Sequence, residues 1–561
     1  MIVQEMTGAA VTIEALKREG IKYVFGLPGT TIMPLLNELY EDEQIRFVTV
    51  RHEQVAAFMA DGYSRATKDG DIGVCLASRG PGAANMTIGL HNSYAESVPV
   101  LALIGQVSDE HYYREAFEEM DLIKFFEPVT KWSMEIHHAK RIPELLQRAV
   151  RTAASGRPRP VMVSIPFNLL SEKVEQIKFH QKHRQKYSMP ALEDIREALQ
   201  MINKAKNPVV LLGGGSSTAT SDIVQLAEIL QLPVITTWLR KDVFPNNHSL
   251  YFGTLGYGAY EVSERLVADA DVIFSIGCHF SEFTTKKWTL ISEKTDIIQL
   301  DIDPEEIGKI YEIKLGLCGD AALTLKSMTR ILPEIETEKN TVVNRKKWIQ
   351  EESERLVQES KLPKDSPTEY VSSHDLVVSV QEVINKHNPS LVMDVPTFGV
   401  WAQRYLQIKE SKKYYGSAGG SMGWGLPAAM GIKLARPEEL VLSIIGDGSF
   451  WMVAQDLETA VRENIPVICL IVNNFSFGNT RDRQKNTYGG KYLGVFYDNP
   501  DFAEYAKLLN AYGERIESAD DLLPAIERAI ASGKPAVIDI IQDQFEGLPE
   551  GLTPIGAEKI D

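Results

Sequence analysis

Short apolar runs that alternate with segments of helical periodicity constrain the fold of this chain more than any other feature. Runs such as "IGVCLAS", "PVVLLGGG" and "LVLSIIG" are apolar at consecutive positions rather than at every second one. A strand that is apolar on both faces is typical of a parallel sheet covered by helices on each side. The pattern recurs along the chain, so we expect an α/β protein built from doubly wound parallel sheets.

The length of the chain, 561 residues, exceeds what a single hydrophobic core normally supports. Two polar and charged segments divide it, at residues 172–190 and 333–367, and we expect both to be linkers. The first and third of the resulting pieces share a plan of strand, glycine-rich turn, helix and apolar strand. The sequence therefore predicts three domains and a C-terminal tail, at residues 1–171, 191–332, 368–545 and 546–561.

The charge and the apolar content of the chain exclude several classes of partner. The net charge is −17, which disfavours nucleic acid and anionic membranes, since both need clustered Lys and Arg. No apolar run reaches about 18 residues, the length that spans a bilayer. The first residues, "MIVQEMTGAAVTIEALKREG", lack the basic start and apolar core of a signal peptide. We therefore expect a cytoplasmic protein without a membrane or nucleic-acid partner.

Two of the predicted strands end on small polar clusters. "VLSII" is followed by Gly446, Asp447 and Gly448, and "VICLIV" by Asn473 and Asn474. The helical segment "AQDLETAVREN" lies between them, so the carboxyl ends of two neighbouring strands would bring Asp447 and Asn474 together. A carboxylate and a carboxamide suit Mg²⁺ or Ca²⁺, and two such ligands plus a diphosphate form a common Mg²⁺ site. The two glycines would let phosphate oxygens approach the backbone.

This pattern and several other motifs resemble the thiamine-diphosphate enzymes. The spacing of "GDG" and "NN" is similar to the cofactor signature of that family. The stretches "RHEQVAAFMADGYSRAT", "SRGPGAAN", "GQVSDEHYYREAFEEMD", "LDIDPEEIGK" and "AGGSMGWGLPAAMG" resemble its acetolactate synthase branch. Benzoylformate decarboxylase and pyruvate oxidase belong to the same superfamily. The resemblance covers nearly the whole chain.

The resemblance implies an architecture, an assembly and a chemistry. The three domains would be a pyrimidine-binding, a central and a diphosphate-binding domain, in that order. The cofactors would be thiamine diphosphate and Mg²⁺, and each active site would lie between two subunits of a homodimer or homotetramer. The substrate would be a small 2-oxo acid, which loses carbon dioxide while the cofactor takes up the electron pair.

The resemblance assigns the catalytic role to Glu53, in "RHEQ". In the family this glutamate hydrogen-bonds the aminopyrimidine of the cofactor and makes its amino group basic. Glu53 follows an apolar strand and begins an apolar-faced helix, so we expect it to be buried against a neighbouring subunit. Met422, in "GGSMGWG", matches the apolar residue that wedges between the two rings of the cofactor.

Further positions are implied by the same motifs. The metal ligands would be Asp447, Asn474 and the backbone carbonyl of Ser476. The cofactor-binding residues would be Pro28, Gly29, Asn85, Thr397, Gly420, Met422, Gly446, Asp447, Gly448, Ser449, Asn474, Ser476, Phe477 and Gly478. The substrate pocket would contain Thr30, Thr31, Phe117, Glu118, Asn479, Thr480 and Arg483.

Several positions depart from the pattern of acetolactate synthases. The arginine that holds the carboxylate of the second 2-oxo acid is replaced by Phe283, so we expect acetolactate formation to be weak or absent. Arg483 replaces a pocket tryptophan, and Arg481 and Arg483 are both candidates to bind an anion. The glutamine of the family's "AFQE" is Glu118, whose protonation state the sequence leaves open. Phe398 stands in a diphosphate loop where the family has a polar residue.

The family's flavin is in doubt for the same kind of reason. Acetolactate synthases carry FAD in the central domain, and "GGG" at residues 213–215 and "DID" at residues 301–303 match that site. The arginine and histidine contacts are replaced by His279, Phe283 and Gly258. A glycine cluster after a strand is a weak signal by itself. We therefore expect no tightly bound FAD.

The main hypothesis is a thiamine-diphosphate- and Mg²⁺-dependent decarboxylase or carboligase of 2-oxo acids that is not a dedicated acetolactate synthase. A simple decarboxylase of the benzoylformate decarboxylase type is an alternative within the same class. A pyruvate oxidase is less consistent with the missing flavin contacts. A non-catalytic scaffold that binds the cofactor is an alternative from a different class. Glu53 disfavours the scaffold, because that residue has no evident use except activation of the cofactor.

Overall fold

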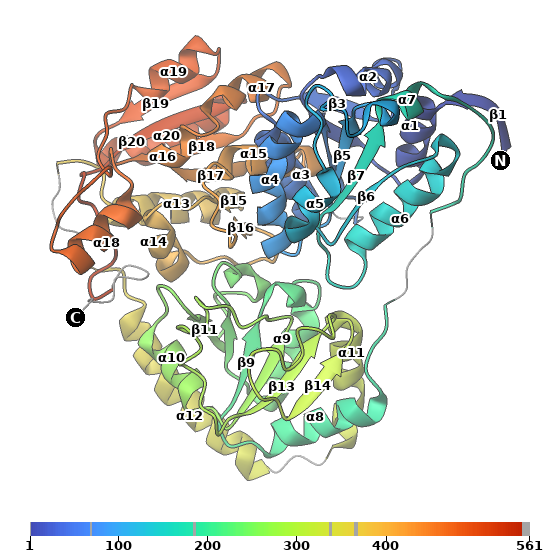
Figure 1. Cartoon of the computed structure of the whole chain (residues 1–561). Helices are drawn as coiled ribbons and strands as arrows, with labels where there is room; N and C mark the ends of the chain where they lie inside the picture. The colour runs from blue at the N-terminus through green and yellow to red at the C-terminus, as the bar shows by residue number, and fades with distance from the viewer. Residues whose placement is uncertain (1, 68–69, 183–186, 336–338, 364–368, 553–561) are drawn as a thin grey trace.

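The computed structural model describes residues 2–67, 70–182, 187–335, 339–363 and 369–552. It contains three parallel sheets of six strands each, all flanked by helices, and this confirms the predicted fold class (Figure 1). Parts of the predicted linkers lie outside the described residues, at 183–186, 336–338 and 364–367. The same holds for residue 368, where the third predicted domain begins, and for residues 553–561 of the predicted tail.

The N-terminal domain has the strand order β3-β2-β4-β5-β7-β6. Its strands are β2 (Tyr23–Gly26), β3 (Arg46–Thr49), β4 (Gly73–Ser78), β5 (Val100–Gln106), β6 (Trp132–Glu135) and β7 (Val161–Pro166). Its helices are α1 (Gly8–Arg18), α2 (Met33–Tyr40), α3 (Glu53–Ala66), α4 (Arg79–Ala95), α5 (Leu122–Phe126), α6 (Ile142–Ala154) and α7 (Phe167–Ser171). β1 (Ile2–Thr7) and β8 (Lys173–Lys178) form a separate antiparallel pair.

The C-terminal domain repeats that strand order, as β16-β15-β17-β18-β20-β19. Its strands are β15 (Ser390–Met393), β16 (Tyr414–Gly416), β17 (Val441–Gly446), β18 (Ile468–Asn473), β19 (Tyr512–Ile516) and β20 (Ala536–Ile541). Its helices are α13 (Ser373–His387), α14 (Phe398–Tyr405), α15 (Gly425–Ala435), α16 (Asp447–Phe450), α17 (Leu457–Arg462), α18 (Gly478–Tyr488), α19 (Phe502–Leu508) and α20 (Ala519–Ser532). β17 and β18 are hydrogen-bonded neighbours, as predicted.

The central domain has the different order β11-β10-β9-β12-β13-β14, which is the dinucleotide-binding order with a switch point between its first and fourth strands. Its strands are β9 (Pro208–Leu212), β10 (Val234–Thr236), β11 (Tyr251–Thr254), β12 (Val272–Ile276), β13 (Asp296–Asp301) and β14 (Leu315–Cys318). Its helices are α8 (Leu192–Lys204), α9 (Thr220–Leu230), α10 (Glu261–Ala268) and α11 (Ala321–Ile331), and α12 (Lys339–Glu359) packs Ile349 on the same core.

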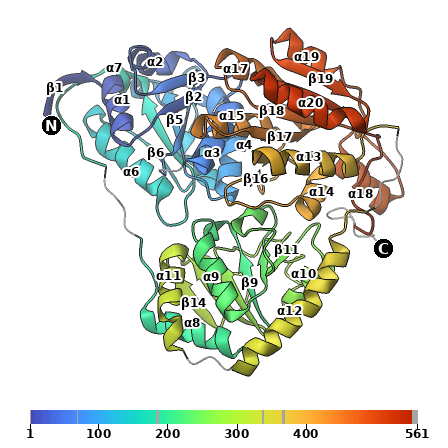
Figure 2. The ribbon, with the colours of Figure 1, turned by 180° about the vertical axis from the view of Figure 1, so that it is seen from behind.

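The N-terminal and C-terminal domains share one hydrophobic core, and the central domain lies beside them (Figures 1 and 2). Helices α3 and α15 pack closely at Gly62, where any larger residue would clash: a Cβ there would lie 2.3 Å from the carbonyl oxygen of Ala428. Trp424 Nε1 also donates to Oδ1 of the buried Asp61 across this contact, at 2.9 Å. Helix α3 begins with Glu53, so this packing fixes the helix that carries the predicted catalytic carboxylate.

Candidate active site

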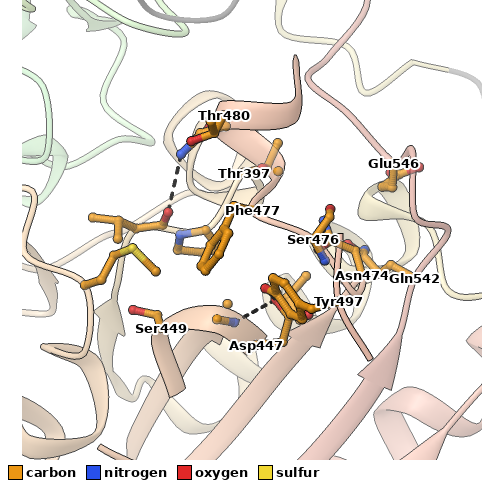
Figure 3. Close-up of a pocket in the computed structure, with 18 of the residues that line it drawn as sticks. Thr397, Asp447, Ser449, Asn474, Ser476, Phe477, Thr480, Tyr497, Gln542 and Glu546 are labelled. Carbon is orange, nitrogen blue, oxygen red and sulfur yellow. Dashed lines mark hydrogen bonds between the residues drawn. The ribbon is translucent and has the colours of Figure 1, made fainter. Parts of the chain in front are cut away.

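A cavity lies at the carboxyl ends of β15, β17 and β18 in the C-terminal domain (Figure 3). It has a volume of about 100 Å³, and none of the described residues that line it comes from another domain. Thr397 and Thr480 lie on one side of it, and Asp447 and Ser449 on the other. Of the predicted cofactor and substrate residues, it brings together Thr397, Met422, Gly446, Asp447, Gly448, Ser449, Asn474, Ser476, Phe477, Gly478, Asn479 and Thr480.

Asp447 is a buried carboxylate whose two oxygens are both oriented. Oδ1 accepts hydrogen bonds from the Gly448 amide at 2.8 Å and the Tyr497 hydroxyl at 3.1 Å. Oδ2 accepts from Asn499 Nδ2 at 2.8 Å. Burial raises the pKa of Asp447 to about 6, because the charged form loses contact with water. A bound cation would compensate that charge.

Asn474 and Ser476 form the facing turn. The Asn474 carboxamide oxygen accepts from the backbone amide and the hydroxyl of Ser476, each at 3.2 Å. No cluster of three or more His, Cys, Asp or Glu that could hold a metal occurs in the described part of the chain. The donor set of Asp447, Asn474 and the Ser476 carbonyl contains one carboxylate, so it fits a hard cation that also takes oxygens from a diphosphate.

The glycines of this cavity leave no room for side chains. A Cβ on Gly448 would lie 2.6 Å from the Phe477 ring, and one on Gly478 would lie 2.4 Å from Thr397 Oγ1. Gly423, which follows the lining residue Met422, has a φ of +83° and donates its amide to Ser449 Oγ at 2.7 Å. Glycine at Gly448 and Gly478 therefore lets Phe477 and Thr397 pack directly on the turns that line the cavity.

A second set of predicted residues gathers at the carboxyl ends of β2, β3, β4 and β5 in the N-terminal domain. Glu53 is 9% exposed, and its Oε2 accepts from Asn85 Nδ2 at 2.9 Å. Its Oε1 faces Gly82, where a Cβ would lie 3.0 Å away. Glu53 thus begins α3 at the end of a strand, as predicted, and is held by a residue of α4.

The loop of residues 28–31 lies against the same strand ends. A Cβ on Gly29 would lie 2.3 Å from the Cβ of Ser78, and Thr31 Oγ1 is hydrogen-bonded to Ser78 Oγ at 2.7 Å. Pro28 and Thr30 are exposed on this loop. At the first turn of α4, the backbone carbonyl of Glu118 accepts from the Gly80 amide at 3.1 Å, and the neighbouring Phe117 is 76% exposed.

Arg481, Arg483 and Gly420 do not line the cavity. Arg481 was a candidate to bind an anion, but it is fully buried. Its guanidinium is committed to Ser476 Oγ, to Asp482 and to the carbonyls of Gln544 and Glu546, so that hypothesis is wrong. Arg483 lies exposed on α18, and Gly420, with a φ of +68°, is also outside the residues that line the cavity.

A larger cavity of about 490 Å³ lies at the switch point of the central sheet. Gly213 closes tightly on the neighbouring strand end, since its Cβ would lie 2.0 Å from the Gly277 carbonyl oxygen. His279 and Phe283 line this cavity together with Asp301, and the Phe283 ring packs against Trp238 with centroids 5.2 Å apart and ring planes inclined by 39°. The position and the glycine turn fit a nucleotide site in general.

Several residues of the two clusters were not anticipated from the sequence. Tyr497 and Asn499 hold Asp447 from a segment with no regular periodicity, and Ser373, Gln542 and Glu546 line the cavity from the start of α13 and beyond β20. No sequence signal marks these five. Arg79, beside Glu118, was also missed, although an arginine inside the glycine-rich "SRGPG" motif could have drawn attention to it.

Comparison with known proteins agrees with this arrangement. The sequence matches three domain families in order: the N-terminal TPP binding domain of thiamine pyrophosphate enzymes at residues 6–125, the central domain at 195–328 and the C-terminal TPP binding domain at 394–540. The chain belongs to the thiamine pyrophosphate enzyme family. It is therefore a thiamine-diphosphate-dependent enzyme that acts on carbon–carbon bonds.

Its relatives within the thiamine pyrophosphate enzymes include large subunits of acetolactate synthase. It is 33% identical to the probable acetolactate synthase large subunit of Methanocaldococcus jannaschii, over 97% of this chain and 93% of the relative. It is 32% identical to the isozyme 3 large subunit of Escherichia coli, over 97% and 96%. It is 31% identical to the putative thiamine pyrophosphate-containing protein YdaP of Bacillus subtilis, over 98% and 94%. No helix in the described ranges is long and apolar enough to cross a membrane.

Proposed function

We propose that this enzyme decarboxylates a 2-oxo acid and transfers the remaining acyl carbon to a second carbonyl compound, using thiamine diphosphate and Mg²⁺. The observation that carries the proposal is the pair of buried, oriented carboxylates at the carboxyl ends of the two sheets, Glu53 after β3 in one domain and Asp447 after β17 in the other. A scaffold that only bound the cofactor would need Asp447 and its cavity but would have no use for an oriented Glu53.

Each residue set has a role in this proposal. Asp447, Asn474 and the Ser476 carbonyl would hold Mg²⁺, and the backbone of Gly446 to Ser449 would face the diphosphate. Met422 would separate the two rings of the cofactor. The bound cofactor supplies an electron sink for the bond that breaks as carbon dioxide leaves. Glu53 would hold a proton at Oε1, because Oε2 is occupied by Asn85.

We also propose that the active site is completed by a second copy of the chain. The cavity around Asp447 has a smaller volume than typical ligand pockets, which measure about 300–1,000 Å³. Glu53 does not line this cavity. A closed two-fold arrangement would bring each Glu53 cluster against the partner's cavity and form two equivalent sites. Light scattering should report a dimer or tetramer, and a monomer with full activity would contradict this.

Acceptor recognition and flavin are open to separate tests. Phe283 packs against Trp238 at the central cavity and carries no charge or donor, so it cannot replace the arginine of acetolactate synthases, and an acceptor carboxylate would have to be held elsewhere. The replaced contacts at His279, Phe283 and Gly258 favour an enzyme without tightly bound FAD. The purified protein should then show no flavin absorbance, and a stoichiometric flavin spectrum would overturn this part.

The experiment that tests the proposal is a panel of 2-oxo acids assayed with thiamine diphosphate and Mg²⁺. Carbon dioxide release should depend on both cofactors and should be accompanied by a ligated product when an acceptor is present. Carbon dioxide release with only an aldehyde as product, with or without acceptors, would favour a simple decarboxylase. Absence of carbon dioxide release with every acid would support the scaffold alternative.

A further inference from the structure

Lys241 is a buried lysine at the boundary between the central and C-terminal domains. It is 2% exposed and begins the short 3₁₀ helix Lys241–Val243, which follows β10. Burial of an ammonium group is costly unless hydrogen bonds replace the water that it loses. In the described part of the chain, the hydrogen-bond partners of this ammonium group are backbone carbonyls rather than a carboxylate.

The three acceptors of Lys241 all belong to the end of one helix. Nζ donates to the carbonyls of Ala402 at 3.0 Å, of Gln403 at 2.9 Å and of Leu406, in the last turn and C-cap of α14. The final carbonyls of a helix lack partners within it, and the helix dipole favours a cation there. An ammonium group has three N–H donors, which match these three acceptors, whereas a neutral amine has two.

Two further contacts attach the same end of α14 to the central domain. Arg404 Nη1 donates to the Ala259 carbonyl at 2.7 Å, and the Tyr260 hydroxyl donates to the Arg404 carbonyl. A Cβ on Gly258 would lie 3.0 Å from Val400 Cγ1, so the helix packs directly on this glycine. Helix α14 lies on the side of the C-terminal domain that faces the central domain (Figures 1 and 2). The central domain therefore holds this end of the helix.

The opposite end of α14 lies at the cavity around Asp447. Val395, Pro396 and Thr397 line that cavity, and the helix begins at the next residue, Phe398. An α-helix of eight residues is about 12 Å long, and its backbone hydrogen bonds make it a stiff unit. The contacts of Lys241 at one end of α14 therefore bear on the position of Thr397 at the other.

We propose that Lys241 is a positioning residue for the cofactor, and that its ammonium group holds α14 where Thr397 faces the bound diphosphate. This inference rests on the proposed function, which places the diphosphate in the Asp447 cavity, and it assigns control of binding to a residue of another domain. No described residue that lines the cavity comes from the central domain. Loss of the ammonium group leaves a carbonyl of α14 without its donor, so the affinity for the cofactor should change.

The protonation of Lys241 makes this role dependent on pH. Burial lowers the pKa of Lys241 to about 7. The elements that surround it carry the ionisable residues Arg240, Asp242, Arg404, Tyr405, Lys413 and Tyr414. Of these, only Asp242 can become an anion near pH 7, and its charge favours the ammonium form. Because the bound state requires the ammonium group, binding takes up a proton above pH 7, and the affinity falls as the pH rises.

Calorimetric titration of thiamine diphosphate at saturating Mg²⁺ between pH 6.5 and 8.5 tests the proposal. The Kd of the wild type should rise by about 5- to 10-fold over this range. Lys241→Met has no proton to lose, so its Kd should be about tenfold above that of the wild type at pH 6.5 and within about twofold of it at pH 8.5. Lys326→Met, at an exposed lysine on α11 of the same domain, is the matched control and should follow the wild type.

Thermal unfolding of the cofactor-free protein distinguishes positioning from a purely structural role. Folding lowers the pKa of Lys241 from 10.5 to about 7, so the unfolded chain binds more protons between these values. The Tm of the wild type relative to Lys241→Met should therefore rise with pH, while the relative affinity of the wild type falls. A purely structural contact would move both quantities in the same direction, which would overturn the proposal.

Two other results would also overturn the proposal. One is a pH profile of affinity that is the same in Lys241→Met as in the wild type. The other is a wild-type affinity that does not fall between pH 7 and 8.5, which needs no variant to fold. Lys241→Gln, with two N–H donors, should bind the cofactor weakly and lack the decline with pH. Unchanged affinity in Asp447→Ala would instead reject the proposed cavity, and the pH profile would still decide whether Lys241 controls binding.

Discussion

The N-terminal and C-terminal domains have the same strand order, and each carries its predicted site residues at the carboxyl ends of its sheet. In each, a carboxylate is held by an amide: Glu53 Oε2 by Asn85 at 2.9 Å and Asp447 Oδ2 by Asn499 at 2.8 Å. The surroundings differ. Asp447 lines a cavity formed by its own domain, whereas the Glu53 cluster is bordered by the exposed Phe117 and the loop 28–31. The shared architecture fixes where a site forms, and the side chains decide its chemistry.

Replacement of the N-terminal carboxylate should have the largest effect. Glu53→Gln keeps the size of the side chain but removes its ability to exchange a proton, so turnover should fall by about 10²–10⁴-fold. Thiamine-diphosphate affinity should stay near that of the wild type, because the diphosphate cavity is untouched. Steady-state kinetics and calorimetry on the same preparation measure both quantities. Near-normal turnover in this variant would remove Glu53 from the mechanism.

Replacement of the C-terminal carboxylate should instead act on binding. Asp447→Ala removes the one charged ligand of the proposed Mg²⁺ site, so Mg²⁺-dependent affinity for thiamine diphosphate should fall by about 100-fold or more. Titration of the cofactor at fixed Mg²⁺ measures this change. Asp521→Ala, an exposed carboxylate on α20, is the control. Unchanged affinity in Asp447→Ala would reject the metal assignment.

The side-chain amides of Asn85 and Asn499, which donate to Glu53 and Asp447, allow a finer comparison of the two domains. Each variant, Asn85→Ala and Asn499→Ala, loses one hydrogen bond to a carboxylate and should lose about tenfold in the property that its half of the site controls. Asn85→Ala should lower kcat, whereas Asn499→Ala should weaken the apparent affinity for Mg²⁺ and recover at high Mg²⁺. If both variants lowered the same parameter by the same factor, the assignment of turnover to the N-terminal domain and of Mg²⁺ binding to the C-terminal domain would be wrong.

Much of this arrangement was predictable because it depends on short-range patterns. Apolar runs fixed the strands, and the clusters after β17 and β18 placed Asp447 and Asn474 at neighbouring strand ends. Tyr497 and Asn499 could not be found this way, since they reach Asp447 from about 50 residues away in a segment without periodicity. The burial of Arg481 was also hidden, because its partners are backbone carbonyls near residues 544–546 that no sequence pattern reveals.

The central claim is that Glu53 of one subunit and Asp447 of another act in one site, and a hybrid dimer tests it most directly. Chains carrying Glu53→Gln and Asp447→Ala should be co-expressed with different affinity tags, and the species that carries both tags should be assayed. Each variant alone should be nearly inactive. In the hybrid one of the two sites receives both defects and the other receives none, so about half of the wild-type activity should return. A hybrid no more active than either variant would show that the two residues act within one chain, and would contradict the account.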